Sequence, residues 1–200
     1  MDDPGTLTRS QRLALELVAA RDAFVAALDD VEPDLLTAPG LLGEWSAREL
    51  VAHLGYWAGH AADALHHAEE GRSDEFEPEA QDVEARNATV AEVARTTDLT
   101  TVRKREQASV DAFLDRLRRA DDAWLDERVG YGDTVEQVLR EDGPDHYREH
   151  TLDIRSWWAG GEPDEGDVDD LDELENPDTE HELDVDRLPG DREPADNERL

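Results

Sequence analysis

Apolar residues recur along this chain at spacings of three, four and seven positions, which is the period of one face of an α-helix. The first series begins near Ser10 and ends before Pro33. A second series follows Ser46 and Glu49, a pair that forms a capping box at a helix N-terminus, and Gly71 ends it. The apolar positions of these two predicted helices are Leu13, Leu17, Phe24, Leu28, Val31, Leu50, Leu54, Trp57, Ala61 and Leu65.

Two further helices are predicted after the polar segment that begins at Gly71. Asp98 or Thr100 can cap the second of them, because a side-chain oxygen there accepts hydrogen bonds from the first backbone N–H groups. Their core-facing stripes are predicted to be Val83, Asn87, Val90 and Ala94 in the third helix, and Val102, Val110, Phe113, Leu114 and Leu117 in the fourth.

The segment 131–160 predicts a short helix, a break and a last helix. Thr134 and Gln137 form the capping box of the short helix, and Gly143–Pro144 marks the break. Gly160 follows the last helix. The inward stripe of that helix is His146, His150, Ile154 and Trp157.

Few segments show the two-residue alternation of a half-buried strand. Several amphipathic helices joined by short loops instead indicate an all-α fold, and we predict an antiparallel four-helix bundle over residues 7–160. Residues 161–200 form an acidic tail whose low hydrophobicity and high charge predict disorder.

Acidic residues dominate the charge of the chain. There are 53 acidic and 20 basic residues, which gives a net charge of −33, and Lys104 is the only lysine. Binding to nucleic acid or to an anionic membrane is therefore disfavoured. The acidic surface can serve solubility alone or adaptation to a salt-rich cytoplasm, and we favour adaptation because lysine is nearly absent.

The chain contains no cysteine, so a metal ion would be held by nitrogen and oxygen ligands. No stretch approaches the roughly 18 apolar residues that span a bilayer, and the first ten residues lack the pattern of a secretory signal. We therefore expect a cytoplasmic protein without a membrane partner.

Three histidines stand out because they lie on predicted apolar stripes. His146 and His150 are one helical turn apart, so both imidazoles can reach one ion. Such a pair can also be a surface pair, or contain one buried imidazole that is hydrogen-bonded to a neighbouring helix. His53 lies midway along the second helix, where an unpartnered polar group would be unfavourable to bury. Together the three positions favour a metal site.

Three sequence blocks resemble the DinB-like four-helix-bundle family, which includes the N-terminal domain of mycothiol-dependent maleylpyruvate isomerases. The blocks are "GEWSARELVAHLGYWAGHAADAL", "DVEARNATVAEV" and "DHYREHTLDIRSWW", and the resemblance covers residues 8–160. It implies that His53, His146 and His150 bind a divalent metal, with zinc or nickel as the expected ion.

The resemblance also implies a function in thiol chemistry. Family members are known or proposed thiol S-transferases, so we expect a low-molecular-weight thiol cosubstrate and a small electrophilic substrate. Three protein ligands would leave a coordination position for a small molecule. The acidic tail stands where the isomerases have a second domain, so maleylpyruvate isomerisation itself is not expected. Homodimer formation is plausible for such bundles.

Four other residues are candidates for the same site. Glu149 and Asp153 each lie three positions from a histidine of the last helix, where a carboxylate can orient an imidazole or simply be solvated. Trp57 and His60 can line a pocket, and His60 can be a fourth ligand, a pocket acid or base, or a helix-face histidine.

Residue chemistry alone leaves other functions open, and it identifies no catalytic base. One alternative is metal-dependent hydrolysis of a small molecule. Another is a non-enzymatic bundle that sequesters a ligand or serves as a scaffold in a stress response. A transferase needs metal and thiol, a hydrolase needs metal alone, and a sequestering protein binds its ligand without turnover.

Overall fold

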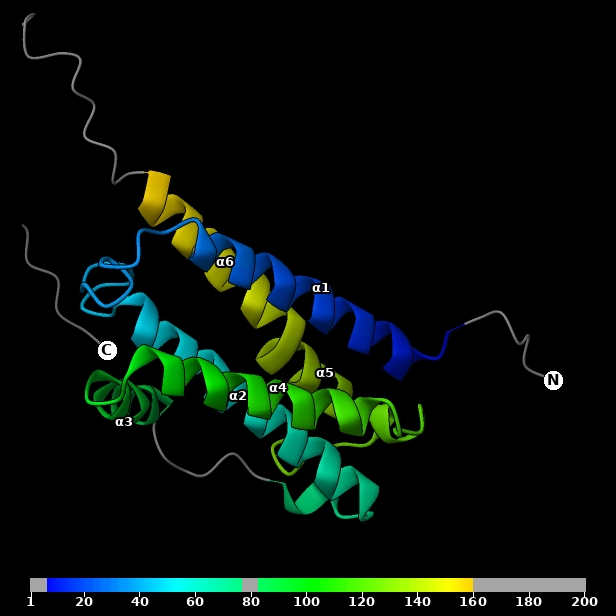
Figure 1. Ribbon diagram of the computed structural model, residues 1–200. Helices are drawn as coiled ribbons and strands as arrows, with labels where there is room; N and C mark the ends of the chain where they lie inside the picture. The colour runs from blue at the N-terminus through cyan, green and yellow to red at the C-terminus, as the bar shows by residue number, and fades with distance from the viewer. Residues whose placement is uncertain (1–6, 77–82, 160–200) are drawn as a thin grey trace, which may run out of the picture. The chain divides into compact units, whose positions relative to one another are not determined.

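The structure is a computed structural model in which residues 7–76 and 83–159 are described. Within these ranges every named element is a helix, which confirms the predicted all-α fold (Figure 1). The predicted disorder of the acidic tail concerns residues outside the described ranges. In chain order the elements are α1 (Arg9–Asp29), α2 (Ala47–Glu69), η1 (Ser73–Glu75), α3 (Val83–Arg95), α4 (Leu99–Leu117), η2 (Trp124–Asp126), α5 (Val135–Arg140), η3 (Glu141–Asp145) and α6 (His146–Ala159).

Four long helices, α1, α2, α4 and α6, form the bundle. Helices α2 and α4 run parallel, because Gly55 lies against Glu106 and, farther along both helices, Arg116 donates a hydrogen bond to Glu69. The approach at Gly55 is so close that a Cβ atom there would lie 2.8 Å from the Glu106 Cα atom. Glycine is therefore required for this helix contact.

The pair α2/α4 packs antiparallel to the pair α1/α6. Arg103 of α4 pairs with Asp29 at the end of α1, whereas the backbone N–H of Arg9, at the start of α1, donates to Asp122 just after α4. The parallel neighbours α2 and α4 need a connection that returns along the bundle, and this connection contains α3 (Figure 1).

Helix α3 packs on α2 and contributes little to the core. Its buried residues are Ala91 and Ala94, whereas Val83 is 53% exposed. The predicted stripe is therefore wrong for Val83, and Asn87 and Val90 are only half-buried. The physical reason is that these side chains face cavities beside α2, which are described below.

Side-chain caps fix the helix starts, as the sequence predicts at most positions. Ser46 and Thr134 form the predicted capping boxes. Thr8 caps α1, so that helix begins slightly before the predicted start at Ser10. Asp98 caps α4, because its side chain accepts a hydrogen bond from the N–H of Thr101.

The predicted break at Gly143–Pro144 is confirmed as a kink, because the backbone angles of Gly143 are not helical. Element η3 is a π-helix in which Gly143 has φ −116° and ψ −114°, and α6 follows it directly. The Gly143 backbone approaches the Phe113 ring of α4 so closely that a Cβ atom would lie 2.9 Å from Phe113 Cε1. The irregular turn thus lets the chain pass a core aromatic ring.

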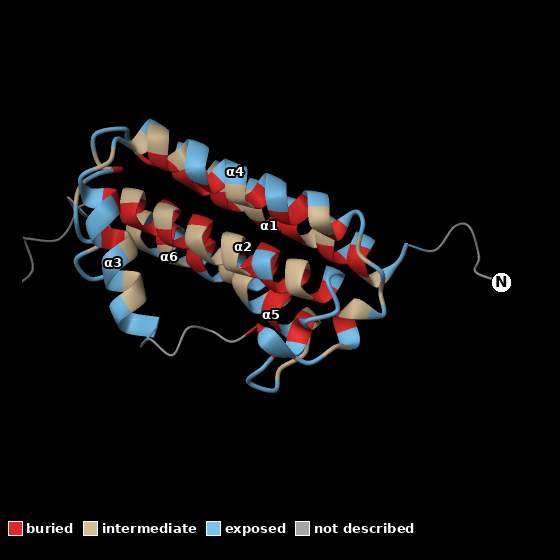
Figure 2. Cartoon of the chain, turned by 90° about the horizontal axis from the view of Figure 1, so that it is seen from below, coloured by how far each residue is buried: buried red, intermediate tan, exposed pale blue. Residues whose placement is uncertain are grey.

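The inner faces of the long helices carry the core (Figure 2). The predicted apolar positions of α1, including Leu13, Leu17 and Phe24, are buried, and so are those of α4. Burial of one such side chain contributes about 1.5–3 kcal/mol. Periodicity therefore identified the core-forming faces of these two helices correctly.

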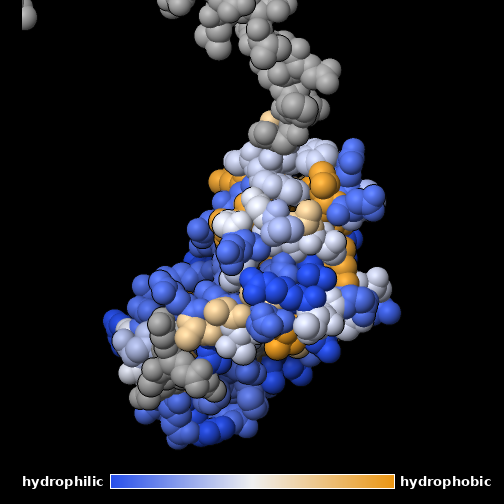
Figure 3. Space-filling model, turned by 90° about the vertical axis from the view of Figure 1, so that its left-hand side faces the viewer, coloured by the Kyte–Doolittle hydropathy of each residue, from blue (hydrophilic) through white to orange (hydrophobic). Residues whose placement is uncertain are grey.

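The outer surface is mainly polar. The face in Figure 3 is largely hydrophilic, with small hydrophobic patches between charged groups. None of the helices in the described part of the chain combines the length and the apolar content that crossing a bilayer requires.

Candidate metal centre

Helices α2 and α6 bring the three predicted histidines together. Ser46 and Glu49 start α2 so that His53 lies two turns into the helix, on its buried face. His146 and His150 begin α6 one turn apart, immediately after the π-turn. The antiparallel packing of the two helices places His53 opposite this pair.

The three imidazoles form a tight group. The Nε2 atoms of His53 and His146 are 2.9 Å apart. The ring centroid of His150 lies 5.3 Å from that of His53 and 4.8 Å from that of His146. One nitrogen from each ring lies within 4.8 Å of the other two, so the three side chains can reach a common ion.

Burial keeps His53 and His146 neutral. It lowers the pKa of His53 to about 4, with a smaller effect from the charge of His150 and an opposing one from the Asn87 side chain. Burial also lowers the pKa of His146 to about 3, assisted by His53 and His150. Near pH 7 both rings therefore keep a lone pair available, as a metal ligand must.

The hydrogen bonds of the group are incomplete. His150 Nδ1 lies 2.7 Å from Asp153 Oδ2, which leaves His150 Nε2 for another partner. In the described part of the chain, the Nδ1 atoms of His53 and His146 are buried and have no hydrogen-bond partner. Buried polar groups are normally paired, so these two Nδ1 atoms are exceptions among the described residues.

The donor set fits a divalent transition metal. Zinc–nitrogen bonds are about 2.0–2.1 Å long, so two nitrogens on one ion lie about 3 Å apart. The 2.9 Å separation of His53 and His146 matches this spacing, although it also suits an N–H···N hydrogen bond. The carboxylate at His150 is the kind of partner that orients a metal-binding imidazole.

Two tryptophans wall the histidine group. The ring centroid of His53 lies 5.2 Å from that of Trp45 and 6.3 Å from that of Trp57. The Nε1–H group of Trp57 donates to Asn87 Oδ1 of α3 at 3.1 Å. The indole is therefore fixed between α2 and α3, where it restricts access to His53.

A cavity of about 460 Å³ lies beside the histidines. Its polar lining includes a second close pair between the same two chain segments, in which His60 Nδ1 is 2.6 Å from Asp142 Oδ2. The cavity is lined by His53, Trp57, His60, Val83, Asn87, Tyr131, Val138, Glu141, Asp142, His146 and Glu149.

The other predicted site residues occupy distinct places. Trp57 and His60 line the cavity, and His60 lies outside the group of three nitrogens that can share an ion. Asp153 contacts His150, whereas Glu149 is exposed on the cavity wall and, in the described residues, makes no hydrogen bond to an imidazole.

Sequence reasoning missed several residues that line the cavity, among them Asp142 and Tyr131. Asp142 lies four positions before His146, so the inward stripe of the last helix continues backwards to it. Because a break ends a helical stripe, the predicted break at Gly143–Pro144 excluded Asp142 from the predicted stripe of the last helix. Tyr131 lies in a loop, where periodicity carries no signal.

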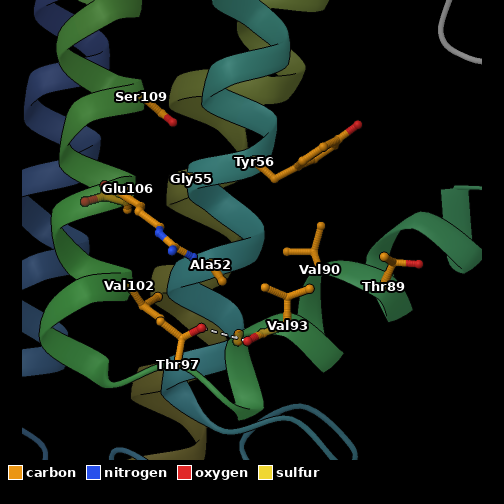
Figure 4. Close-up of a pocket in the computed structure, with 12 residues that line it drawn as sticks. Ala52, Gly55, Tyr56, Thr89, Val90, Val93, Thr97, Val102, Glu106 and Ser109 are labelled. Atoms are coloured by element: carbon orange, nitrogen blue, oxygen red, sulfur yellow. Dashed lines mark hydrogen bonds between the residues drawn. The ribbon is translucent and has the colours of Figure 1, made fainter.

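A second, more apolar cavity of about 300 Å³ lies on another side of α2 (Figure 4). Gly55 and Tyr56 of α2, Val90 and Val93 of α3, and Glu106 of α4 are among its lining residues. None of the three clustered histidines lines it. Helix α3 thus forms part of the wall of both cavities, while His53 and His146 line only the larger one.

Comparison with known proteins gives one family. The sequence profile of the mycothiol maleylpyruvate isomerase N-terminal domain matches residues 16–143, more than half of the chain. This match confirms the family resemblance and contains the first two sequence blocks, whereas the third block, with His146 and His150, follows the matched residues. No curated protein matches the chain by sequence.

Solved structures share the fold at low sequence identity. An uncharacterised protein from Escherichia coli UTI89 has a TM-score of 0.65 and 12% identity, over 79% of this chain and 97% of that chain. A mycothiol-dependent maleylpyruvate isomerase has a TM-score of 0.60 and 20% identity, over 74% of this chain and 61% of that chain. A variant of that isomerase with a histidine replaced by alanine gives a TM-score of 0.60 at 19% identity.

Proposed function

Because the chain belongs to the mycothiol maleylpyruvate isomerase N-terminal domain family, we propose that His53, His146 and His150 bind one divalent metal ion, zinc or nickel. We further propose that the protein transfers a low-molecular-weight thiol to a small electrophile at this site. The observation that carries the proposal is the convergence of three imidazoles, with one nitrogen of each within 4.8 Å of the others and the Nε2 atoms of His53 and His146 2.9 Å apart.

Family and fold support the thiol. A solved relative with this fold is a mycothiol-dependent isomerase, so one protein of similar structure uses a small thiol. The present chain has no cysteine, so the reacting sulfur would come from a cosubstrate. A divalent ion with three protein ligands has room for a small molecule and lowers the pKa of a coordinated thiol or water.

The protein residues have three roles in this proposal. Asp153 orients His150 through its Nδ1 atom and so fixes which nitrogen faces the shared centre. Trp45 and Trp57 limit water access to His53. The adjoining cavity has the volume of a small-molecule site and opens the centre to substrates.

The first test is elemental analysis of protein purified in high KCl. The wild-type protein should contain about one equivalent of a transition metal, and both His53→Ala and His150→Ala should lose it. His67→Ala is the matched control, because His67 is also on α2 but bonds to the Asp63 backbone carbonyl outside the cluster. A wild-type protein that takes up neither added zinc nor added nickel would contradict the metal site.

Turnover assays then separate the classes of function. The transferase proposal predicts product only when metal, thiol and electrophile are all present. Activity with metal but without thiol would identify a hydrolase instead. Ligand binding without turnover under either condition would favour a sequestering bundle.

A further inference from the structure

Helix α2 meets the α5–α6 segment at two places along one cavity. At the first, His53 contacts His146, and at the second, His60 contacts Asp142. The two histidines are seven residues apart, so they lie about two helical turns, or roughly 10 Å, from each other on the same face. The second contact therefore belongs to the same cavity but is separate from the metal centre.

The His60–Asp142 pair is short and well enclosed. His60 Nδ1 lies 2.6 Å from Asp142 Oδ2, and the two side chains are only 17% and 15% exposed. The His60 ring is held between the rings of Phe76 and Trp57, with centroids 4.8 and 5.2 Å away. Packing on two sides and a hydrogen bond on a third fix the orientation of the imidazole.

The irregular turn before α6 positions the carboxylate. Asp142 lies inside the π-helical segment, next to Gly143, whose backbone packs against the Phe113 ring. π-Helical turns occur often at functional sites. Burial raises the pKa of Asp142, and the hydrogen bond and charge of His60 oppose this effect.

One ring nitrogen of His60 is free for chemistry. In the described residues His60 Nε2 has no hydrogen-bond partner, and unlike the Nδ1 atoms of His53 and His146 it is not sealed from solvent. An imidazole with Nδ1 bonded to a carboxylate and Nε2 accessible is the arrangement of a proton-transfer group.

The other titratable side chains of the cavity are less suited to this role. Tyr131 holds its proton near neutral pH, because burial and nearby carboxylates raise its pKa to about 12. Glu141 and Glu149 are exposed and have no hydrogen bond that fixes them within the described residues. His146 belongs to the metal centre.

We propose that His60 is the proton-transfer residue of this cavity and that Asp142 is its positioning residue, an inference that rests on the proposed thiol transfer. His60 Nε2 accepts the proton when the S–H bond of the thiol breaks, and the electron pair stays on sulfur. That pair forms the bond to the electrophilic carbon. The bond between that carbon and the leaving group breaks, and the leaving group departs with its electron pair and receives the proton from His60.

The test compares His60→Gln, Asp142→Asn and the control His67→Gln, each loaded with one equivalent of metal and checked for helical content. His67 suits the control because it also packs beside Phe76, with centroids 5.4 Å apart, but has no carboxylate partner at hydrogen-bond distance. The assay measures kcat/KM from pH 5 to 8 for a series of thiols of different acidity.

His60→Gln should lower kcat/KM about 100-fold for a weakly acidic thiol. The loss should shrink for thiols that are already ionised at the assay pH, because they need no base. Asp142→Asn should give a smaller loss with the same trend, and His67→Gln should behave as the wild-type protein.

A second readout needs no activity. Nitrogen-15 NMR of the metal-free full chain should find the His60 proton on Nδ1, and Asp142→Asn should move it towards Nε2. An unchanged tautomer would overturn the positioning role of Asp142. A loss of activity that is equal for all thiols, or no loss in His60→Gln, would make His60 structural.

The outcomes for the two proposals differ. A wild-type protein that is inactive with metal and every thiol would overturn the proposed function. The His60–Asp142 pair would then have no proton-transfer role either. A wild-type protein that transfers thiols while His60→Gln matches it at every pH would overturn the inference about His60 alone.

Discussion

Two buried polar clusters in this bundle differ in whether protein atoms complete them. At the contact of α1, α4 and α6, the Glu106 carboxylate accepts two hydrogen bonds from Arg21, both at 2.7 Å, and a third from the Tyr147 hydroxyl at 2.6 Å. At the contact of α2 and α6, by contrast, His53 and His146 share one close approach and each keeps an unpaired, buried Nδ1 atom.

This difference separates a structural role from a binding role. A buried charge that is fully paired, such as Glu106, needs nothing more and holds its helices in register. Buried groups without partners are unfavourable unless a ligand completes them. The comparison therefore predicts that changes at the first cluster reduce stability, whereas changes at the second reduce metal binding.

The largest effect is expected from Glu106→Ala. Removal of the carboxylate leaves the Arg21 guanidinium largely buried without its partner, which should lower the free energy of unfolding by about 3–5 kcal/mol. Urea unfolding of the metal-free protein measures it. Tyr147→Phe, which removes one hydrogen bond to the charged carboxylate, should lose about 1.5–3 kcal/mol. A loss below 1 kcal/mol in Glu106→Ala would contradict the structural assignment.

Acid should weaken the folded metal-free protein through the histidine cluster. The pKa values of His53 and His146 are about 4 and 3 in the folded chain, below the ordinary value near 6.5 that applies when unfolded. Between the folded and unfolded pKa values, the unfolded chain binds more protons than the folded chain. The stability that the neutral histidines contribute is therefore complete above about pH 6.5 and is lost as pH falls. At pH 5 the loss should be about 2 kcal/mol for each histidine, at 1.36 kcal/mol per pH unit.

Urea unfolding at pH 7 and pH 5, in constant high KCl, measures this loss. The variant with both His53→Gln and His146→Gln is the reference, since it keeps the carboxylates that also titrate in acid. If the reference loses as much stability as the wild-type protein, the cluster does not cause the acid effect.

Metal should stabilise the wild-type protein by mass action. An ion present at 100 times its dissociation constant, and bound only by the folded state, adds about 2.7 kcal/mol to the free energy of unfolding. His150→Ala should show no such gain at the same concentration, whereas Tyr147→Phe should keep it. A gain in His150→Ala equal to that of the wild-type protein would place the metal elsewhere.

Much of the fold could be predicted because it depends on local patterns. Capping boxes at Ser46 and Thr134 and the helical period of α1 and α4 specify helices without knowledge of their partners. Helix α3 was predicted less well. Val83 and Asn87 lie at helical spacing, but they face a cavity rather than the core, and spacing alone does not distinguish the two.

Site residues that lie on a helical stripe could be predicted from the sequence, whereas contacts between distant helices could not. His53, His146 and His150 lie on stripes, and the structure brings their nitrogens together. The pairing of Glu106 with Arg21 joins helices far apart in sequence, so no local pattern indicates it. The predictions of a cytoplasmic location, salt adaptation and a homodimer stay predictions.

The smallest effect is expected where a carboxylate acts on the metal only through an imidazole. Asp153→Asn removes the charge beside His150 Nδ1 but keeps a side chain of similar shape. Loss of such a partner typically lowers metal affinity about 10- to 100-fold, because the imidazole becomes a weaker and less well oriented ligand. Competition with a chelator of known affinity measures the change.

Glu149→Gln is the matched control, because Glu149 is on the same helix and lines the cavity but, in the described residues, is not hydrogen-bonded to any of the three imidazoles. It should bind metal as the wild-type protein does. Equal losses in both variants would indicate that the general negative charge near the site, rather than the contact with His150, supports metal binding. A loss confined to Asp153→Asn would show that metal binding by the histidine cluster depends on one specific carboxylate, as the cluster of Arg21 and Tyr147 depends on Glu106.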